Sequence, residues 1–473
     1  MKKLLWLIVP ASAALMVLAA QQRGDININI SKTGELPRIA IPDFRGAGDA
    51  QKFMAAFNET LAADVAASGQ LKLVSKSMMP VFTPQQPSDF VTPAPVQQAP
   101  APKRGRPAPP PQPTNGGGHW IADWSSPPLS ANYLAFGYTA VQNGVFVLRG
   151  WLFDASKPDV SGAQMLGKTY LASVDEAGAR KTAHEFATDI IALFGGKSMF
   201  GTHIYYVHRE SARSTVSEIW RMDPDGGNAM QLTRFGITSL YPAVSADGTK
   251  IAFSSNRSFK WDIFVFSVDL RPRDLRFYNP NTRMNSQPSF TPDGKQVVFM
   301  STAGTDKCCR IFIANLDGSG VRPLTSSVFI DAEPKVNPKT GADVVFSSGR
   351  SGPEQVYKMN IDGGDVERLS DGTGEAANPS WHPNGQKIAF AWTRGFAAGK
   401  FNIFIMDVTT RSYNQLTHDE GKNENPSWAP DGIHLAFMSN RTGTEQIWTM
   451  LADGSQPQQI TKQGVNSSPV WGM

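Results

Sequence analysis

Cysteine is almost absent from the sequence, which excludes a disulfide-stapled fold. The only two cysteines among 473 residues, Cys308 and Cys309, are neighbours. Neighbouring residues on a strand point to opposite faces, so a bridge between them would be strained. The pair also lacks the spacing of a metal or redox motif. We therefore expect a chain held together by burial of its core.

Charge is scarce and nearly balanced. Charged residues make up 18% of the chain, and the formal net charge is +4. A nucleic-acid-binding surface would need a basic stripe or a basic domain, so we expect no nucleic-acid partner. Glycine and proline are plentiful instead, at 42 and 34 residues, which is typical of a turn-rich β fold.

Long hydrophobic runs are missing except at the N-terminus. Lys2 and Lys3 precede an uncharged apolar stretch at 4–20 that ends in small residues. This pattern predicts a signal peptide over residues 1–20, cut after Ala19 or Ala20. An uncleaved anchor is the alternative, although the run is short for a membrane-spanning helix. We expect the mature protein to be exported and not inserted in the membrane.

The first half of the mature chain alternates short apolar strands with amphipathic helices. One helix places an apolar residue at every fourth position from Phe53 to Val65, and a second follows a predicted capping pair, Ser173 and Glu176. Strands are predicted at 36–41, 71–74, 133–141, 145–153 and 164–172. Strands in one group with two helices on one face predict a small α+β domain over residues 24–198.

A proline-rich segment interrupts this domain at residues 80–116. Twelve of the 34 prolines fall there, together with a Lys-Arg-Gly-Arg cluster at 103–106. Such a composition buries too little apolar surface to offset the entropy of ordering, so we interpret it as a disordered insertion. A docking role for a proline-binding partner is the alternative.

From residue 202 to the end the sequence repeats. Each unit has a proline in a short strand, a tight turn and a second apolar strand, and the period is near 45 residues. The repeat prolines are Pro242, Pro288, Pro334, Pro379, Pro426 and Pro469. This period matches the four-stranded blades of a β-propeller.

The ends of the repeat predict how the propeller closes. The first unit, from His203, lacks the proline-led strand, and the C-terminus around Pro469 supplies one such strand with nothing after it. A linear array would leave that strand as an exposed edge. We therefore predict an all-β six-bladed β-propeller over 202–473, closed by the C-terminal strand.

The order of these parts resembles the TolB family, the periplasmic component of the Tol-Pal system. The resemblance covers nearly the whole mature chain apart from the proline-rich segment. It includes the alternating Ile and Asn residues at 25–30, the stretch at 39–44, and the segments 153–154 and 166–168. The likeness implies a periplasmic, non-enzymatic protein that acts in outer-membrane integrity and in envelope constriction at division.

The resemblance also implies two protein partners. The N-terminal strand would bind a TolA-like inner-membrane protein, and the propeller would bind Pal, the peptidoglycan-associated lipoprotein. The candidate TolA-binding residues are Asp25, Ile26, Asn27, Ile28, Asn29 and Ile30. From the alternation alone, this strand can equally lie on its own domain or add to the sheet of a partner. We expect a monomer with no cofactor.

The inner-strand entry positions of the six blades are the candidate surface for the lipoprotein. The residue before each repeat proline should lie at one mouth of the channel, and these residues are Tyr241, Gln287, Glu333, Asn378, Asn425 and Ser468. One carboxylate among six residues makes a poor metal cage but a suitable polar rim for a protein partner.

The sequence offers little for catalysis. The seven histidines lack metal-ligand spacing, and Asp247, Asp293 and Asp431 are accounted for by their turns. We therefore assign no catalytic, metal or cofactor-binding residue. Two alternatives stay open, namely a metal-dependent lyase or hydrolase that uses the propeller channel, and an exported propeller that binds a peptide or glycan outside any Tol system.

Overall fold

The computed structural model describes residues 36–91, 117–257, 260–267, 284–303, 309–418 and 420–473. Three predicted features lie outside these residues: the signal peptide at 1–20, the strand at 25–30 and Cys308. The part of the proline-rich segment at 92–116 also lies outside them.

The N-terminal domain is built on one mixed sheet. Its strand order is β3-β1-β4-β5-β6, and β2 pairs with β4 off this path. The strands are β1 (Arg38–Ala40), β2 (Arg45–Ala47), β3 (Lys72–Leu73), β4 (Tyr133–Gln142), β5 (Val145–Asp154) and β6 (Gln164–Ala172). Strand β1 runs parallel to β3 and β4, whereas β4, β5 and β6 are antiparallel. Each of the five strands predicted for this domain is present.

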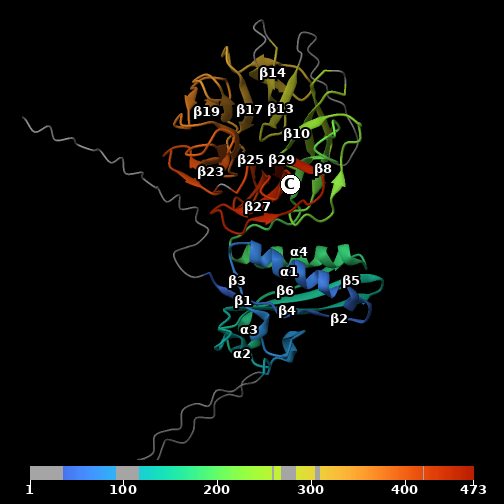
Figure 1. Ribbon diagram of the computed structural model, residues 1–473. Helices are drawn as coiled ribbons and strands as arrows, with labels where there is room; N and C mark the ends of the chain where they lie inside the picture. Colours follow the sequence, from blue (N-terminus) through green and yellow to red (C-terminus); the bar gives the residue numbers. More distant parts are fainter. Residues whose placement is uncertain (1–35, 92–116, 258–259, 268–283, 304–308, 419) are drawn as a thin grey trace, which may run out of the picture.

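Two long helices cover the face of this sheet that is turned toward the propeller (Figure 1). They are α1 (Met54–Ala67), preceded by the 3-10 helix η1 (Gly48–Phe53), and α4 (Glu176–Leu193). The predicted apolar stripe of α1 is buried in the domain core together with that of α4. The cap of α4 differs from the prediction: the Asp175 carboxylate, and not Ser173, accepts the backbone N–H of Gly178 at 2.7 Å.

The opposite face of the sheet carries a second, smaller core. Here lie the short helices α2 (Ile121–Ser125) and α3 (Val160–Ala163) and the 3-10 helices η2 (Lys76–Met78) and η3 (Pro87–Asp89). Phe90 is only 6% exposed and packs against Phe136 and Phe153. The predicted start of the insertion at residue 80 is therefore too early, because residues 80–91 belong to the folded domain. The proline-rich composition of that stretch concealed Phe90, which anchors it in this core, and Phe82, which stacks on His119.

The rest of the described chain forms six sheets arranged as the blades of a propeller (Figure 1). The closing blade holds β29 (Val465–Gly472), β7 (His203–Arg209), β8 (Glu218–Met222) and β9 (Met230–Gln231). The next two hold β10 (Ser239–Val244), β11 (Lys250–Ser255) and β12 (Asp262–Ser267), then β13 (Asn285–Phe290), β14 (Gln296–Ser301), β15 (Arg310–Asn315) and β16 (Arg322–Pro323). The fourth holds β17 (Asp331–Val336), β18 (Asp343–Ser348), β19 (Gln355–Asn360) and β20 (Glu367–Arg368). The last two hold β21 (Ala376–Trp381), β22 (Lys387–Trp392), β23 (Asn402–Asp407) and β24 (Tyr413–Gln415), then β25 (Asn423–Trp428), β26 (His434–Ser439), β27 (Gln446–Leu451) and β28 (Gln458–Gln459).

The ring closes as predicted. Strand β29 pairs antiparallel with β7, and Trp471 lies opposite Ile204 in the register. The C-terminal strand thus completes the first blade, and the edge it would otherwise expose is removed. The fold class, an α+β domain followed by a six-bladed β-propeller, is confirmed.

Local chemistry explains the turns between the first two strands of a blade. In one blade Gly294 has a φ of 63°, and its N–H reaches the carbonyl of Thr291 at 2.9 Å. The Asp293 carboxylate accepts from the Thr291 hydroxyl at 2.6 Å and from the N–H of Lys295 at 3.1 Å. This aspartate is therefore engaged in its turn, as the sequence indicates.

None of the helices in the described part of the chain has the length and apolarity needed to span a bilayer.

Candidate functional site

The six inner-strand entry positions come together at one mouth of the propeller channel. They line a cavity of about 60 Å³, which we call the mouth cavity. The group, called the mouth ring below, consists of Tyr241, Gln287, Glu333, Asn378, Asn425 and Ser468. The repeat pattern therefore located a shared surface from residues that lie up to five repeats apart in the sequence.

Every member of the mouth ring has a left-handed backbone. Their φ values lie between 50° and 56°, and each residue precedes a repeat proline. In each blade the register between the first two strands shifts across this position, which marks a β-bulge. A positive φ in a residue other than glycine costs about 1 kcal/mol or more. The surrounding structure therefore enforces the same strained geometry six times around one opening.

Side chains of the mouth ring also link neighbouring blades. The Gln287 side-chain oxygen accepts the backbone N–H of Glu333 at 2.9 Å. A Glu333 carboxylate oxygen accepts the N–H of Asn378 at 2.6 Å, and the Asn378 side-chain oxygen accepts that of Asn425 at 3.3 Å. Three successive blade contacts thus use one pattern, in which each side chain binds the equivalent backbone group of the next blade. The repeat period does not reveal this structural role.

Glu333 is the electrostatic centre of the mouth. Besides the Asn378 N–H, it accepts the Asn378 amide at 2.5 Å and the Ser347 hydroxyl at 2.7 Å. Burial, followed by the charge of Glu333 and other carboxylates, raises the pKa of Glu354 to about 7. Burial, with Glu333 among the contributing charges, likewise raises the pKa of Glu424. This face of the propeller therefore carries several carboxylates near one opening, with their charges in mutual repulsion.

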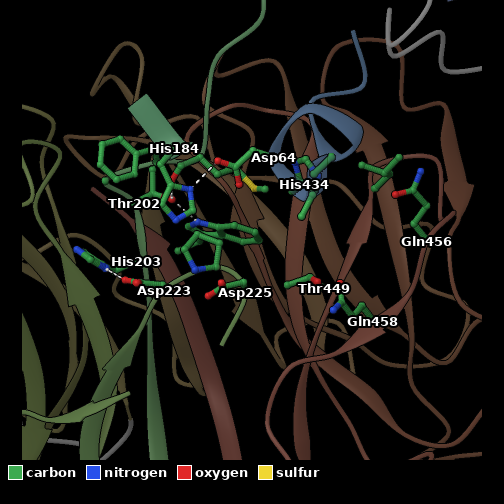
Figure 2. Close-up of a pocket in the computed structure, with 18 of the residues that line it drawn as sticks. Asp64, His184, Thr202, His203, Asp223, Asp225, His434, Thr449, Gln456 and Gln458 are labelled. Atoms are coloured by element: carbon green, nitrogen blue, oxygen red, sulfur yellow. Dashed lines mark hydrogen bonds and ion pairs between the residues drawn. The ribbon is translucent and has the colours of Figure 1, made fainter. Parts of the chain in front are cut away.

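A second cavity, which the sequence did not indicate, lies between the two domains (Figure 2). We call it the domain cavity; its volume is about 250 Å³. Its walls come from α1 and α4, from the linker that enters the propeller, and from β26, β27 and β29. The Trp471 indole donates to the Thr202 hydroxyl at 2.9 Å, so the closing strand is tied to the linker.

Histidine–carboxylate pairs line the domain cavity. His184 lies 2.6 Å from Asp64 within the N-terminal domain, and His203 lies 3.1 Å from Asp223 within the propeller (Figure 2). Burial acts to lower the pKa of His184, but the Asp64 hydrogen bond and the charges of Asp64, Asp225 and Asp223 raise it overall. Two of these carboxylates come from the propeller, so His184 couples the domains electrostatically.

The histidines of the domain cavity are not arranged as a metal centre. His434, the third histidine, pairs with its own carboxylate, Asp431, at 2.6 Å. Within the described ranges, no group of three or more His, Cys, Asp or Glu side chains is placed to hold a metal ion. Each of these three histidine–carboxylate pairs lies within one domain, and the domains are coupled through the charges of Asp223 and Asp225 acting on His184.

A family comparison matches the propeller. Residues 191–395 and 368–473 match the family described as the TolB beta propeller domain. The chain belongs to the TolB beta-propeller family. The resemblance inferred from the order of the parts is thereby confirmed.

Curated relatives and a solved structure agree with this TolB assignment. The chain is 33% identical over 199 residues to a TolB homolog of Chlorobium luteolum, a match that covers 42% of this chain and 43% of that protein. It is 29% identical over 247 residues to the Tol-Pal system protein TolB of Bordetella pertussis, covering 52% and 53%. The matches thus span about half the length of these curated relatives. The crystal structure of TolB from Acinetobacter baumannii shares the fold with a TM-score of 0.72 at 22% identity, covering 93% of this chain and 97% of that one.

Proposed function

We propose that this protein is a non-enzymatic periplasmic scaffold of the Tol-Pal system. It links a TolA-like inner-membrane protein to a Pal-like peptidoglycan-associated lipoprotein, and so supports outer-membrane integrity and envelope constriction at division. In this proposal residues 1–20 direct export, and the mature protein acts as a monomer without a cofactor. The observation that carries it is the mouth ring, a shaped polar opening on a propeller of the TolB family.

The mouth ring suits a protein partner better than a reaction. Its single carboxylate, Glu333, is already engaged with the next blade and with Ser347. Tyr241 is 36% exposed at the same opening, and an aromatic residue beside a polar rim is a typical anchor of protein interfaces. The lipoprotein would therefore contact Tyr241 and the amide side chains around it.

The N-terminal strand is the proposed contact for the TolA-like partner. Its alternation of Ile with Asn over residues 25–30 suits addition to the edge of another sheet. The two partners would then use separate parts of the chain. Removing one contact should leave the other intact.

A pull-down from detergent-solubilised envelope tests this arrangement. The baits are the mature protein, a version lacking residues 25–32, and Tyr241→Ala. Leu171→Ala is the matched control, because Leu171 is 58% exposed on β6 of the other domain. The proposal expects that the deletion loses only the TolA-like protein and Tyr241→Ala only the lipoprotein. Recovery of neither partner by the intact bait would refute it, and glycan arrays and metal analysis of the channel would follow.

A further inference from the structure

A second layer of residues lies two positions after the mouth ring in the sequence, directly after each repeat proline. Its members are Ala243, Ser289, Lys335, Ser380, Ser427 and Val470. The three serines share one role, since each hydroxyl oxygen accepts a backbone N–H of the next blade. The acceptor–donor pairs are Ser289 with Val336 at 3.1 Å, Ser380 with Trp428 at 3.4 Å and Ser427 with Trp471 at 2.9 Å.

Lys335 departs from this pattern. An ammonium group has no lone pair with which to accept a hydrogen bond, so it cannot replace the serine hydroxyl. The link to the next blade is made by the backbone instead: the Trp381 indole N–H donates to the Lys335 carbonyl at 3.0 Å. The lysine side chain therefore takes no part in joining the blades.

The side chain of Lys335 lies within the channel. It lines the mouth cavity and also a larger channel cavity of about 350 Å³, so it stands where the two meet. Pro426, Pro469 and Val470 line both cavities as well, and they offer no charge. Lys335 therefore lies between the polar mouth ring and an uncharged, apolar part of the channel wall.

Among the residues that the structure describes, no carboxylate lies within ion-pair distance of Lys335, and Glu333 directs its oxygens to Asn378 and Ser347. Burial lowers the pKa of Lys335, and the charge of Glu333 opposes this only in part. The side chain of Lys335 is half-buried. A partly desolvated charge without a partner is costly, and an anion that enters the channel would offset that cost.

We propose that Lys335 anchors an anion-binding site inside the propeller channel, and that the site takes a single carboxylate group. The small volume of the mouth cavity accommodates a carboxylate but not a large ligand. One ammonium balances one negative charge, and the carboxylates at the mouth disfavour a dianion. The carboxylate comes either from a free small monocarboxylate or from an acidic side chain that a protein partner inserts through the mouth. The second source rests on the proposed function.

Binding measurements on the full mature chain test the site and separate its two sources. Lys335→Met removes the charge and keeps the length of the stem, and Lys335→Arg keeps the charge. Lys295→Met is the matched control, because Lys295 is an exposed lysine at a turn of the same propeller. Thermal unfolding of each variant first verifies that it folds.

The first arm follows the line width of carbon-13-labelled acetate by NMR, and the second measures affinity for the purified Pal-like lipoprotein. A site for free carboxylates predicts saturable broadening with the wild type, Lys335→Arg and Lys295→Met, and its loss in Lys335→Met. A site for a partner side chain predicts at least a tenfold loss of affinity in Lys335→Met alone. The site is overturned if neither readout distinguishes Lys335→Met from the wild type. If the wild type fails to bind the lipoprotein, the proposed function fails, while the acetate arm still decides the site.

Discussion

Glu333 links two blades and also carries the only charge of the mouth ring, and two substitutions separate these roles. Glu333→Ala removes the acceptor of three hydrogen bonds, two from Asn378 in the next blade and one from Ser347. Glu333→Gln removes the charge but keeps a side-chain oxygen in place. The natural precedent is Gln287, which binds the next blade from the equivalent position.

The expected cost follows from these contacts. A hydrogen bond to a charged group contributes about 1.5–3 kcal/mol, and water in the channel can replace part of what alanine removes. We therefore expect Glu333→Ala to lower the free energy of unfolding by about 3 kcal/mol. For a domain of this size that corresponds to a Tm lower by roughly 6 °C. Glu333→Gln should cost about 1 kcal/mol or less, because it also relieves the repulsion of Glu354.

Thermal unfolding of the purified chain at neutral pH, followed by calorimetry, measures both variants. The comparison is internally controlled, since both lose the same charge and only alanine loses the link. Equal stabilities for the two variants, within about 0.5 kcal/mol, would refute the structural role of Glu333.

Three further predictions concern pH and the domain junction. The pKa of Glu354 is raised to about 7, so the folded protein holds this proton more tightly than the unfolded chain does. The stability gained from the protonated carboxyl is complete below its ordinary pKa of 4.5 and is lost as the pH rises through 7. Urea titrations should therefore find Glu354→Gln more stabilising at pH 8 than at pH 5, and equal effects would contradict this. Asp64 and the propeller carboxylates raise the pKa of His184 against the effect of burial. The stability that protonated His184 provides is complete below its ordinary pKa of 6.5 and is lost at higher pH. His184→Asn should therefore destabilise the protein more at pH 6 than at pH 9. Trp471→Phe removes the indole bond to Thr202 and should cost about 1 kcal/mol, whereas an unchanged calorimetric Tm would show that this bond is dispensable.

Sequence periodicity predicted those parts of the molecule that repeat. The proline spacing located all six blades and the mouth ring, because the first strand of every blade has the same β-bulge at the residue before its proline. Strand β6 has the bounds predicted for it, 164–172. Closure by the C-terminal strand was predictable because the first repeat lacks its proline-led strand and the C-terminus supplies one.

Features that depend on assembly could not be predicted in this way. The domain cavity forms where two separately patterned units meet, and the stripe of α1 describes only the face turned to its own sheet. The position of Phe90 in the second core was concealed by prolines around it, and the cap at Asp175 rather than Ser173 depends on the path of the chain into α4. The inter-blade hydrogen bonds of Glu333 likewise require three-dimensional contacts between repeats.

The central claim, that the lipoprotein binds at the mouth ring, is tested most directly by photo-crosslinking in living cells. A photoreactive phenylalanine analogue is placed at Tyr241, and the same analogue at Leu171 on the N-terminal domain serves as the control. The account predicts an adduct with a peptidoglycan-associated lipoprotein from position 241 and none from position 171. A lipoprotein adduct from position 171 alone, or from neither position while the protein is present at normal levels, would contradict it.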